Sequence, residues 1–275
     1  MSRLFSFGVA VAAGITLLFL LIPIVAIFAR VPPGDLVAAL GRGQATDALI
    51  VSIETNLIAL AAIIVFGTPT AWLIATRAGR LRDVAVTLVE LPLVLPPAVA
   101  GIGLLAAFGR VGLVGGHIHV IGTELAFTKA AVVVAIAFVA SPFYIRSAIA
   151  AFESLDPAMI HAARTLGAGP GRTFARVALP LAAAGLGSGA ALAFARGIGE
   201  FGATLMFAGS LRGVTQTLPL AIYEAFDLDF DLALAISAEL VVISAVILLL
   251  TKVVFRWRSM SPSTTLFAPS RPQST

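Results

Sequence analysis

Six apolar runs, each long enough to cross a bilayer, constrain this chain more than any other feature of its sequence. About 20 apolar residues in a helix span the hydrocarbon core. Hydrophobic residues make up 59% of the chain and charged residues 12%, outside the usual range of soluble domains. We therefore predict an all-α, polytopic membrane protein with six transmembrane helices. They are expected at residues 7–29, 48–75, 84–108, 126–145, 181–206 and 231–255.

The six runs form one predicted membrane domain, residues 1–258, followed by a Ser/Pro/Thr-rich cytoplasmic tail, residues 259–275, expected to be disordered. The first run is longer than the apolar region of a secretory signal, so we expect it to be retained. Most Lys and Arg residues fall on one side if the N-terminus is cytoplasmic, which predicts that both termini are cytoplasmic. The expected location is the cytoplasmic (inner) membrane.

The third run contains three prolines, Pro92, Pro96 and Pro97. Proline removes a backbone donor and breaks a helix. Broken backbone at membrane depth is tolerated only where protein or a water-filled cavity satisfies it. The run is therefore predicted to line a translocation pathway, with a kinked packing helix as the alternative.

The fifth run carries two ionisable residues, Arg196 and Glu200, among the glycines Gly199 and Gly202. Residues four apart on a helix can pair along one face, and glycines permit close packing. We predict a role at the pathway or at a permease interface; a static internal salt bridge is the alternative. Three lone acids in or near the runs are expected to bond within the bundle: Glu54, Glu90 and Glu239.

A polar segment, residues 154–180, separates the fourth and fifth runs and is predicted to form two short helices outside the membrane. Asp156 is a suitable N-cap and Pro157 suits the first helical position. Gly167 can end the helix in the left-handed conformation. Ile160 and Ala163 share one face at helical spacing. This segment therefore indicates a docking surface for another protein.

The polar segment resembles the EAA loop of permease subunits of bacterial ABC importers, in its Gly167 and the later Leu179-Pro180. Three stretches are similar to the molybdate permease family within that superfamily, and the likeness covers about residues 48–255. They are Leu91-Pro92-Leu93-Val94-Leu95-Pro96-Pro97, Ala162-Ala163-Arg164-Thr165-Leu166-Gly167-Ala168-Gly169, and Leu192-Ala193-Phe194-Ala195-Arg196 with Gly199-Glu200-Phe201-Gly202-Ala203-Thr204.

The resemblance implies a type I ABC importer permease fold, with a cytoplasmic coupling helix between transmembrane helices 4 and 5. The implied ATPase-coupling residues are His161, Ala162, Ala163, Arg164, Leu166 and Gly167. The residues assigned to the pathway or permease interface are Pro92, Pro96, Pro97, Arg196, Gly199, Glu200 and Gly202. His161 stands where the family's loop usually has glutamate, which removes a charge from that position.

The resemblance also implies partners: a second copy of the permease, two ABC ATPase subunits and an extracytoplasmic molybdate-binding protein, with no nucleic acid. No phosphate-binding Gly-x-x-x-x-Gly-Lys-Ser/Thr motif occurs, so ATP and Mg would be bound by the partner ATPase. We expect no catalytic residue, no metal site and no cofactor in this chain. His117 and His119 lack a suitably spaced third ligand.

The sequence is compatible with several alternative functions. A sulfate or tungstate permease would share the architecture and differ only in cargo. An ion-coupled secondary transporter would show internal repeats and buried coupling acids, and the two halves show no self-similarity. An intramembrane enzyme would need a nucleophile with its base, or metal ligands, at membrane depth. No single residue in the sequence identifies the anion.

Overall fold

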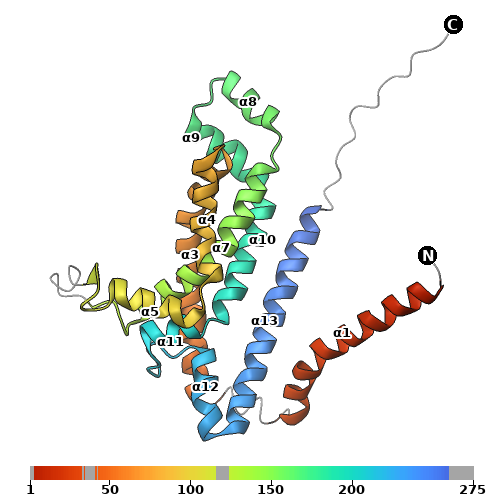
Figure 1. The fold of residues 1–275 in the computed structure, drawn as a ribbon, viewed down its shortest axis with the longest axis vertical. Helices are drawn as coiled ribbons and strands as arrows, with labels where there is room; N and C mark the ends of the chain where they lie inside the picture. The colour runs from red at the N-terminus through yellow and green to blue at the C-terminus, as the bar shows by residue number, and fades with distance from the viewer. Residues whose placement is uncertain (1–2, 33, 35–40, 42, 116–123, 260–275) are drawn as a thin grey trace.

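The computed structural model describes all of the chain except residues 1–2, 33, 35–40, 42, 116–123 and 260–275 (Figure 1). The described residues contain helices and no strand, which confirms the predicted all-α fold. Five of these helices are long and apolar enough to cross a membrane. A sixth span results if two helices bent by 111° are counted together. The predicted tail, apart from its first residue, lies outside the described residues.

Three long helices form the centre of the bundle: α3 (Gly43–Ala75), α7 (Lys129–Glu153) and α10 (Leu179–Ile198). Glycines let the helices approach closely, since a Cβ on Gly67 would lie 3.0 Å from the ring of Tyr144. The hydroxyl groups of Tyr144 and Thr68 are 2.6 Å apart and buried. Close packing and interhelical hydrogen bonds of this kind hold helices together in lipid.

The third predicted span is broken into α4 (Arg80–Val94) and α5 (Pro97–Phe108). Leu95 and Pro96 have extended backbone between them, with ψ values of 130° and 135°. Proline disfavours helical backbone at the residue before it, so two consecutive prolines end α4 and turn α5 away (Figure 1). Pro92 is accommodated inside α4.

Helix α4 has no buried residue and is joined to α7 by ion pairs at its surface. The Arg146 Nε lies 3.1 Å from Glu90 Oε1. Arg82 pairs with Glu153 in the same way. Helix α4 also packs partly buried apolar side chains, Val89 among them, against the apolar cluster of α3 and α7, so its position beside the bundle depends on that contact together with the ion pairs.

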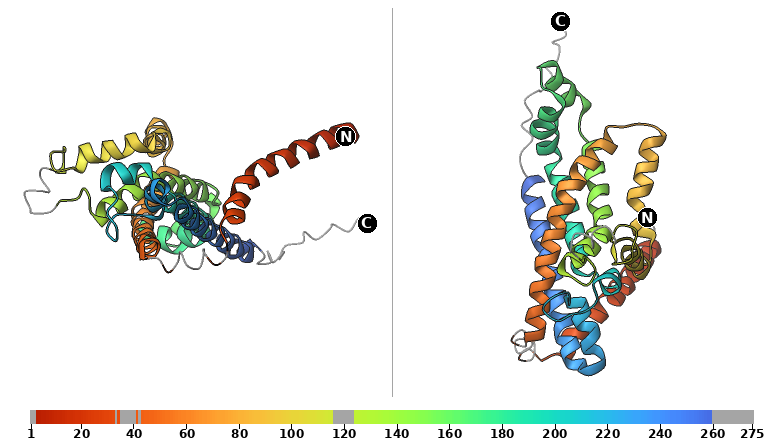
Figure 2. Two further views of the ribbon diagram at one scale, coloured as in Figure 1. Left: turned by 90° about the horizontal axis from the view of Figure 1, so that it is seen from below. Right: turned by 90° about the vertical axis from the view of Figure 1, so that its left-hand side faces the viewer.

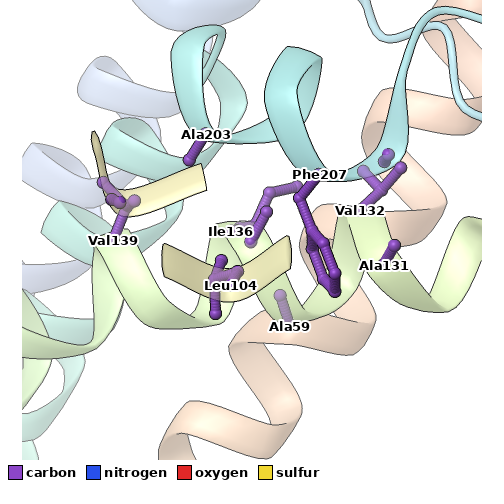
Figure 3. Close-up of a cluster of buried hydrophobic side chains, with 11 residues drawn as sticks. Ala59, Leu104, Ala131, Val132, Ile136, Val139, Ala203 and Phe207 are labelled. Carbon is purple, nitrogen blue, oxygen red and sulfur yellow. The ribbon is translucent and has the colours of Figure 1, made fainter. Parts of the chain in front are cut away.

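The short helix α11 (Gly202–Ala208) packs against both α5 and α7. Phe207 is fully buried in an apolar cluster that also contains Leu104 of α5 and Ile136 of α7 (Figure 3). Ala59 brings α3 into the same cluster. This cluster fixes the otherwise divergent α5 against the centre of the bundle.

The predicted spans leave residues 208–229 as a loop between the fifth and sixth, and this is wrong, because α12 (Leu218–Leu228) occupies half of that segment. Pro219 lies in its first turn, where a missing N–H is tolerated. Leu218, Ala221 and Ala225 follow helical spacing and pack against α13 (Phe230–Ser259). The chain thus forms a helical hairpin in which α12 packs against the last span.

Helix α1 (Arg3–Arg30) stands apart from the rest of the bundle in Figure 1 and in the left view of Figure 2. None of its most apolar 18-residue window is buried. The chain packs onto the bundle just after α1, where Val31 meets Ala235 of α13. The first predicted span is therefore a long apolar helix whose sides are uncovered in the single chain.

Candidate functional site

The two runs predicted to line the pathway are both broken in the structure, and the two breaks meet in space. A Cβ on Gly202, the first residue of α11, would lie 2.8 Å from the Cβ of Pro97, the first residue of α5. A Cβ on Gly101 would lie 2.7 Å from the carbonyl oxygen of Ala203. Distances this short leave no room for a Cβ at either glycine, one on each helix, so α5 and α11 approach closely.

The second break divides the fifth predicted span, residues 181–206. Helix α10 ends at Ile198 and α11 begins at Gly202. The Glu200 Oε1 atom accepts a hydrogen bond from the Ala203 amide at 2.9 Å, satisfying a donor in the first turn of α11. We call the region formed by Pro96, Pro97, Gly101, Arg196, Gly199, Glu200 and Gly202 the broken-helix site.

The predicted pairing of Arg196 with Glu200 is present. The Arg196 Nη2 and Glu200 Oε2 atoms are 2.7 Å apart, and the two side chains are 28% and 1% exposed. Glu200 therefore makes two different contacts across the break, one to each helix. It joins α10 to α11 where the backbone hydrogen-bond ladder is interrupted.

Asn56 of α3 holds the end of α10 and was not predicted as a site residue. Its Nδ2 donates to the Phe194 carbonyl oxygen at 2.9 Å. A Cβ on Gly197 would collide with Asn56 Oδ1, so glycine is required there. The available signal was a lone amide side chain inside an apolar run, which is a functional indication in membrane helices.

The other predicted residues of the third run are placed by the same break. Pro96 is the N-cap of α5 and exposed. Pro92 lies within α4, before the bend, and so outside the contact between α5 and α11. Of the three prolines, Pro97 alone contacts Gly202 directly.

Two of the three lone acids have partners in the bundle, as expected. Lys129 Nζ donates to Glu54 Oε2 at 2.7 Å, and Glu90 pairs with Arg146. Both carboxylate oxygens of Glu239 are buried and have no hydrogen-bond partner among the described residues. The expected bond within the bundle is therefore not found for Glu239.

The second predicted site, residues 154–180, lies at the opposite end of α10 from the broken-helix site (Figure 1). It contains α8 (Pro157–Thr165), α9 (Pro170–Thr173) and the π-helical turn η1 (Phe174–Ala178). We call residues 154–180 the docking segment. The two predicted short helices are present, and η1 continues the second of them directly into α10.

Local interactions define α8 as predicted. Asp156 Oδ1 accepts from the Ala158 amide at 2.8 Å, and Pro157 is the first helical residue. Gly167 has a φ of 84°, the left-handed conformation that ends helices. The expected residues of this cap therefore hold the expected positions.

The face of α8 that contains Ile160 and Ala163 is not the face that points away from the bundle. Ile160 is partly buried and packs against the apolar cluster at this end of the bundle, so it faces inward. Ala163 is also partly covered, whereas His161, Ala162, Arg164 and Leu166 are exposed. The outward surface is therefore polar and alanine-rich with Leu166 at its edge. His117 and His119 lie outside the described residues.

Three aromatic rings connect the docking segment to the bundle. The Trp72 ring of α3 lies 5.2 Å from that of Phe152 in α7 and 5.6 Å from that of Phe174 in η1, between centroids. Aromatic contacts at these distances add to area burial. The docking segment is thus in direct contact with α3 and α7 and is continuous with the start of α10.

Comparison with known proteins gives consistent matches over most of the chain. The family described as "binding-protein-dependent transport system inner membrane component" matches residues 63–259. The molybdenum transport system permease protein ModB of Mycobacterium tuberculosis is 44% identical over 233 residues, 85% of this chain and 88% of that protein. The probable transport system permease protein NifC of Clostridium pasteurianum is 41% identical over 209 residues, 76% and 73% of the two chains.

Two solved structures share the fold. A chain of the inward-facing MetNI methionine ABC transporter has a TM-score of 0.61 at 21% identity, covering 81% of this chain and 97% of that chain. A chain of a bacterial alginate ABC transporter has a TM-score of 0.69 at 18% identity, covering 94% and 95%. At these identities the likeness concerns the fold alone.

Proposed function

This chain belongs to the family of binding-protein-dependent transport system inner membrane components, and we propose that it is the membrane-spanning permease of an ABC importer for molybdate. The observation that carries the proposal is the 44% identity, over 85% of the chain, to a relative named for molybdenum transport. The match also spans 88% of that relative. Because 233 of the 275 residues of this chain are aligned, the likeness includes both the broken-helix site and the docking segment.

The proposed complex contains two copies of this permease, two ATPase subunits on the cytoplasmic side and a binding protein that delivers molybdate from outside. Both termini and the docking segment are proposed to be cytoplasmic, following the positive-inside rule. An exposed helix with no buried residue, α8, supports this role, because such a surface is free to enter a partner's groove. ATP and Mg would be bound by the ATPase, and this chain is proposed to have no cofactor of its own.

The contacts of the docking segment support a route for coupling. Helix α8 contacts η1 and α9, and η1 continues into α10. Helix α10 ends at the broken-helix site. If closure of the ATPase pair draws the two copies of α8 together, α10 transmits that displacement to the opposite end of the bundle. Alternating access would follow from the change in how α5 and α11 line the pathway.

The broken-helix site supports a role for these residues in lining the pathway. Backbone that is not helical inside a bilayer needs protein or water around it. Pro96, Pro97 and Gly199 are exposed in the single chain, so a second copy or a water-filled pathway would have to cover them. A lipid-facing surface would leave the interrupted backbone unsatisfied.

The proposal is tested by uptake of labelled molybdate into vesicles that contain this chain with its ATPase and binding protein. ATP-dependent uptake that resists excess sulfate supports the proposal, and competition by unlabelled tungstate then measures selectivity between the two similar anions. Uptake abolished by sulfate would keep the architecture and change the cargo. Uptake driven by an ion gradient without ATP would contradict the proposed function.

A further inference from the structure

The Arg196–Glu200 pair lies at membrane depth. Asn56 of α3 donates a hydrogen bond to the Phe194 carbonyl oxygen at the end of α10. With a helical rise of about 1.5 Å per residue, Asn56 lies about 20 Å along α3 from its first residue. Helix α3 contains 33 residues, more than enough to cross a hydrocarbon core about 30 Å thick. Arg196 follows Phe194 by two residues and so lies within the span.

The two members of the pair are held very differently. Glu200 is 1% exposed and its Oε1 is bonded to the Ala203 amide. Arg196 is 28% exposed, and Glu200 is the one partner of its guanidinium among the described residues. A guanidinium has five N–H donors. Arg196 therefore keeps donors that no described protein atom satisfies.

The exposed side of the Arg196 side chain lies next to backbone that no other described segment covers. No atom lies within 4 Å of the place where a Cβ on Gly199 would be. Ala195 and Gly199 are exposed beside Arg196 on the end of α10. Ionisable groups inside a membrane face the protein interior or a water-filled cavity rather than lipid. The unused donors thus point to a ligand that passes along this face.

We propose that Arg196 contacts the oxyanion during its passage and that Glu200 holds the guanidinium between passages. This inference rests on the proposed function and names a residue of the pathway for it. A guanidinium matches the oxygens of a tetrahedral dianion with parallel N–H donors. Glu200 remains fixed to α11, so its carboxylate repels the bound anion and favours release.

Binding of labelled molybdate to the detergent-solubilised permease–ATPase complex, without the binding protein, tests this inference. Arg196→Gln is expected to weaken binding by at least about tenfold, because bonds to charged groups are lost. Arg196→Lys keeps the positive charge but lacks the forked guanidinium, so its affinity for molybdate is expected to lie between those of the wild type and Arg196→Gln. Glu200→Gln keeps an oxygen for the Ala203 amide, frees Arg196, and is expected to bind the anion more tightly.

The opposite changes in molybdate affinity expected for Arg196→Gln and Glu200→Gln distinguish contact with the anion from a purely structural salt bridge. If the pair is only a structural salt bridge, Arg196→Gln and Glu200→Gln should change molybdate binding in the same direction, and that result would overturn the inference. So would unchanged binding in both variants, or a wild-type complex that binds no molybdate. Arg212→Gln is the matched control, because Arg212 pairs with Asp47 at 3.1 Å near the beginning of α3, and it is expected to leave binding unchanged.

The inference and the proposed function fail separately. A wild-type complex that shows no ATP-dependent molybdate uptake contradicts the proposed function. A complex that imports molybdate normally while its Arg196 and Glu200 variants bind the anion as the wild type does contradicts only the inference. Co-purification of the ATPase with each variant shows that the permease has assembled.

Discussion

The docking segment and the broken-helix site lie at opposite ends of α10 and are stabilised in opposite ways. Helix α8 has no buried residue, and its ends are set by Asp156 and by the left-handed Gly167. The broken-helix site depends on contacts between distant segments, such as Gly202 against Pro97 and Gly101 against Ala203. A surface that must enter a partner is defined locally, whereas a break inside the membrane is defined by its neighbours.

This difference predicts different consequences for small substitutions. Changes in the broken-helix site are expected to disturb the fold and transport together, because the same backbone contacts serve both. Changes at the two ends of α8, which lie away from the bundle core, are expected to alter coupling and leave the bundle intact. The following variants test that distinction, from the largest expected effect to the smallest.

Gly101→Ala is expected to have the largest effect. Its Cβ would lie 2.7 Å from the Ala203 carbonyl oxygen, and overpacking of this kind costs about 1–3 kcal/mol. We expect a lower midpoint of thermal inactivation in detergent and a severe loss of molybdate uptake. Gly103→Ala, two residues away with open space around it, is the control and should behave as the wild type. Equal loss in both variants would contradict the contact between α5 and α11.

Gly167→Val is expected to lower coupling without lowering stability of the bundle. A β-branched residue at a φ of 84° is strained by about 1–2 kcal/mol, so the end of α8 should rearrange. ATPase activity stimulated by the loaded binding protein should fall, with an unchanged thermal midpoint. Gly167→Asn should keep most of the stimulation, because asparagine tolerates this conformation. Full activity of the valine variant would contradict the docking role.

Asp156→Ala is expected to have an intermediate effect. Loss of an N-cap costs about 1 kcal/mol of helix stability, here without compensation from burial. Amide exchange in the first turn of α8 should accelerate, and stimulated ATPase activity should fall partially. Asp156→Asn retains a cap and should restore both. An exchange rate unaffected by the alanine substitution would show that α8 is stabilised by contacts other than this cap.

Glu90→Gln is expected to have the smallest effect. It removes an ion pair with Arg146 whose side chains are 59% and 37% exposed, and exposed pairs contribute less than about 1 kcal/mol. The thermal midpoint and uptake should stay close to those of the wild type. A large loss would show that α4 depends on this pair more than its exposure indicates.

Local chemistry explains which features could be predicted from the sequence. Asp156, Pro157 and Gly167 act within one turn of their own position, so the bounds of α8 followed from residue types. Proline pairs likewise indicated the break before α5. The Arg196–Glu200 pair was also a local prediction, because its members are four residues apart.

Features that depend on tertiary contacts were not predictable in the same way. Nothing near Gly202 in the sequence indicates Pro97 as its neighbour, and no local pattern assigns Asn56 to the end of α10. Helix α12 was missed because its polar flanks and Pro219 resemble a loop. Its small buried residues, Ala221 and Ala225, were the available signal.

Accessibility of a single cysteine at residue 199 tests the central claim, that the broken-helix site lines a water-filled pathway. The chain contains no cysteine, so Gly199→Cys can be labelled with a membrane-impermeant thiol reagent. The matched control is Ile58→Cys, which lies near Asn56 in α3 on an exposed apolar face. We predict that residue 199 reacts and that its rate changes when ATP binds to the complex, while residue 58 stays unreactive. A residue 199 as unreactive as residue 58 with and without ATP would contradict the claim.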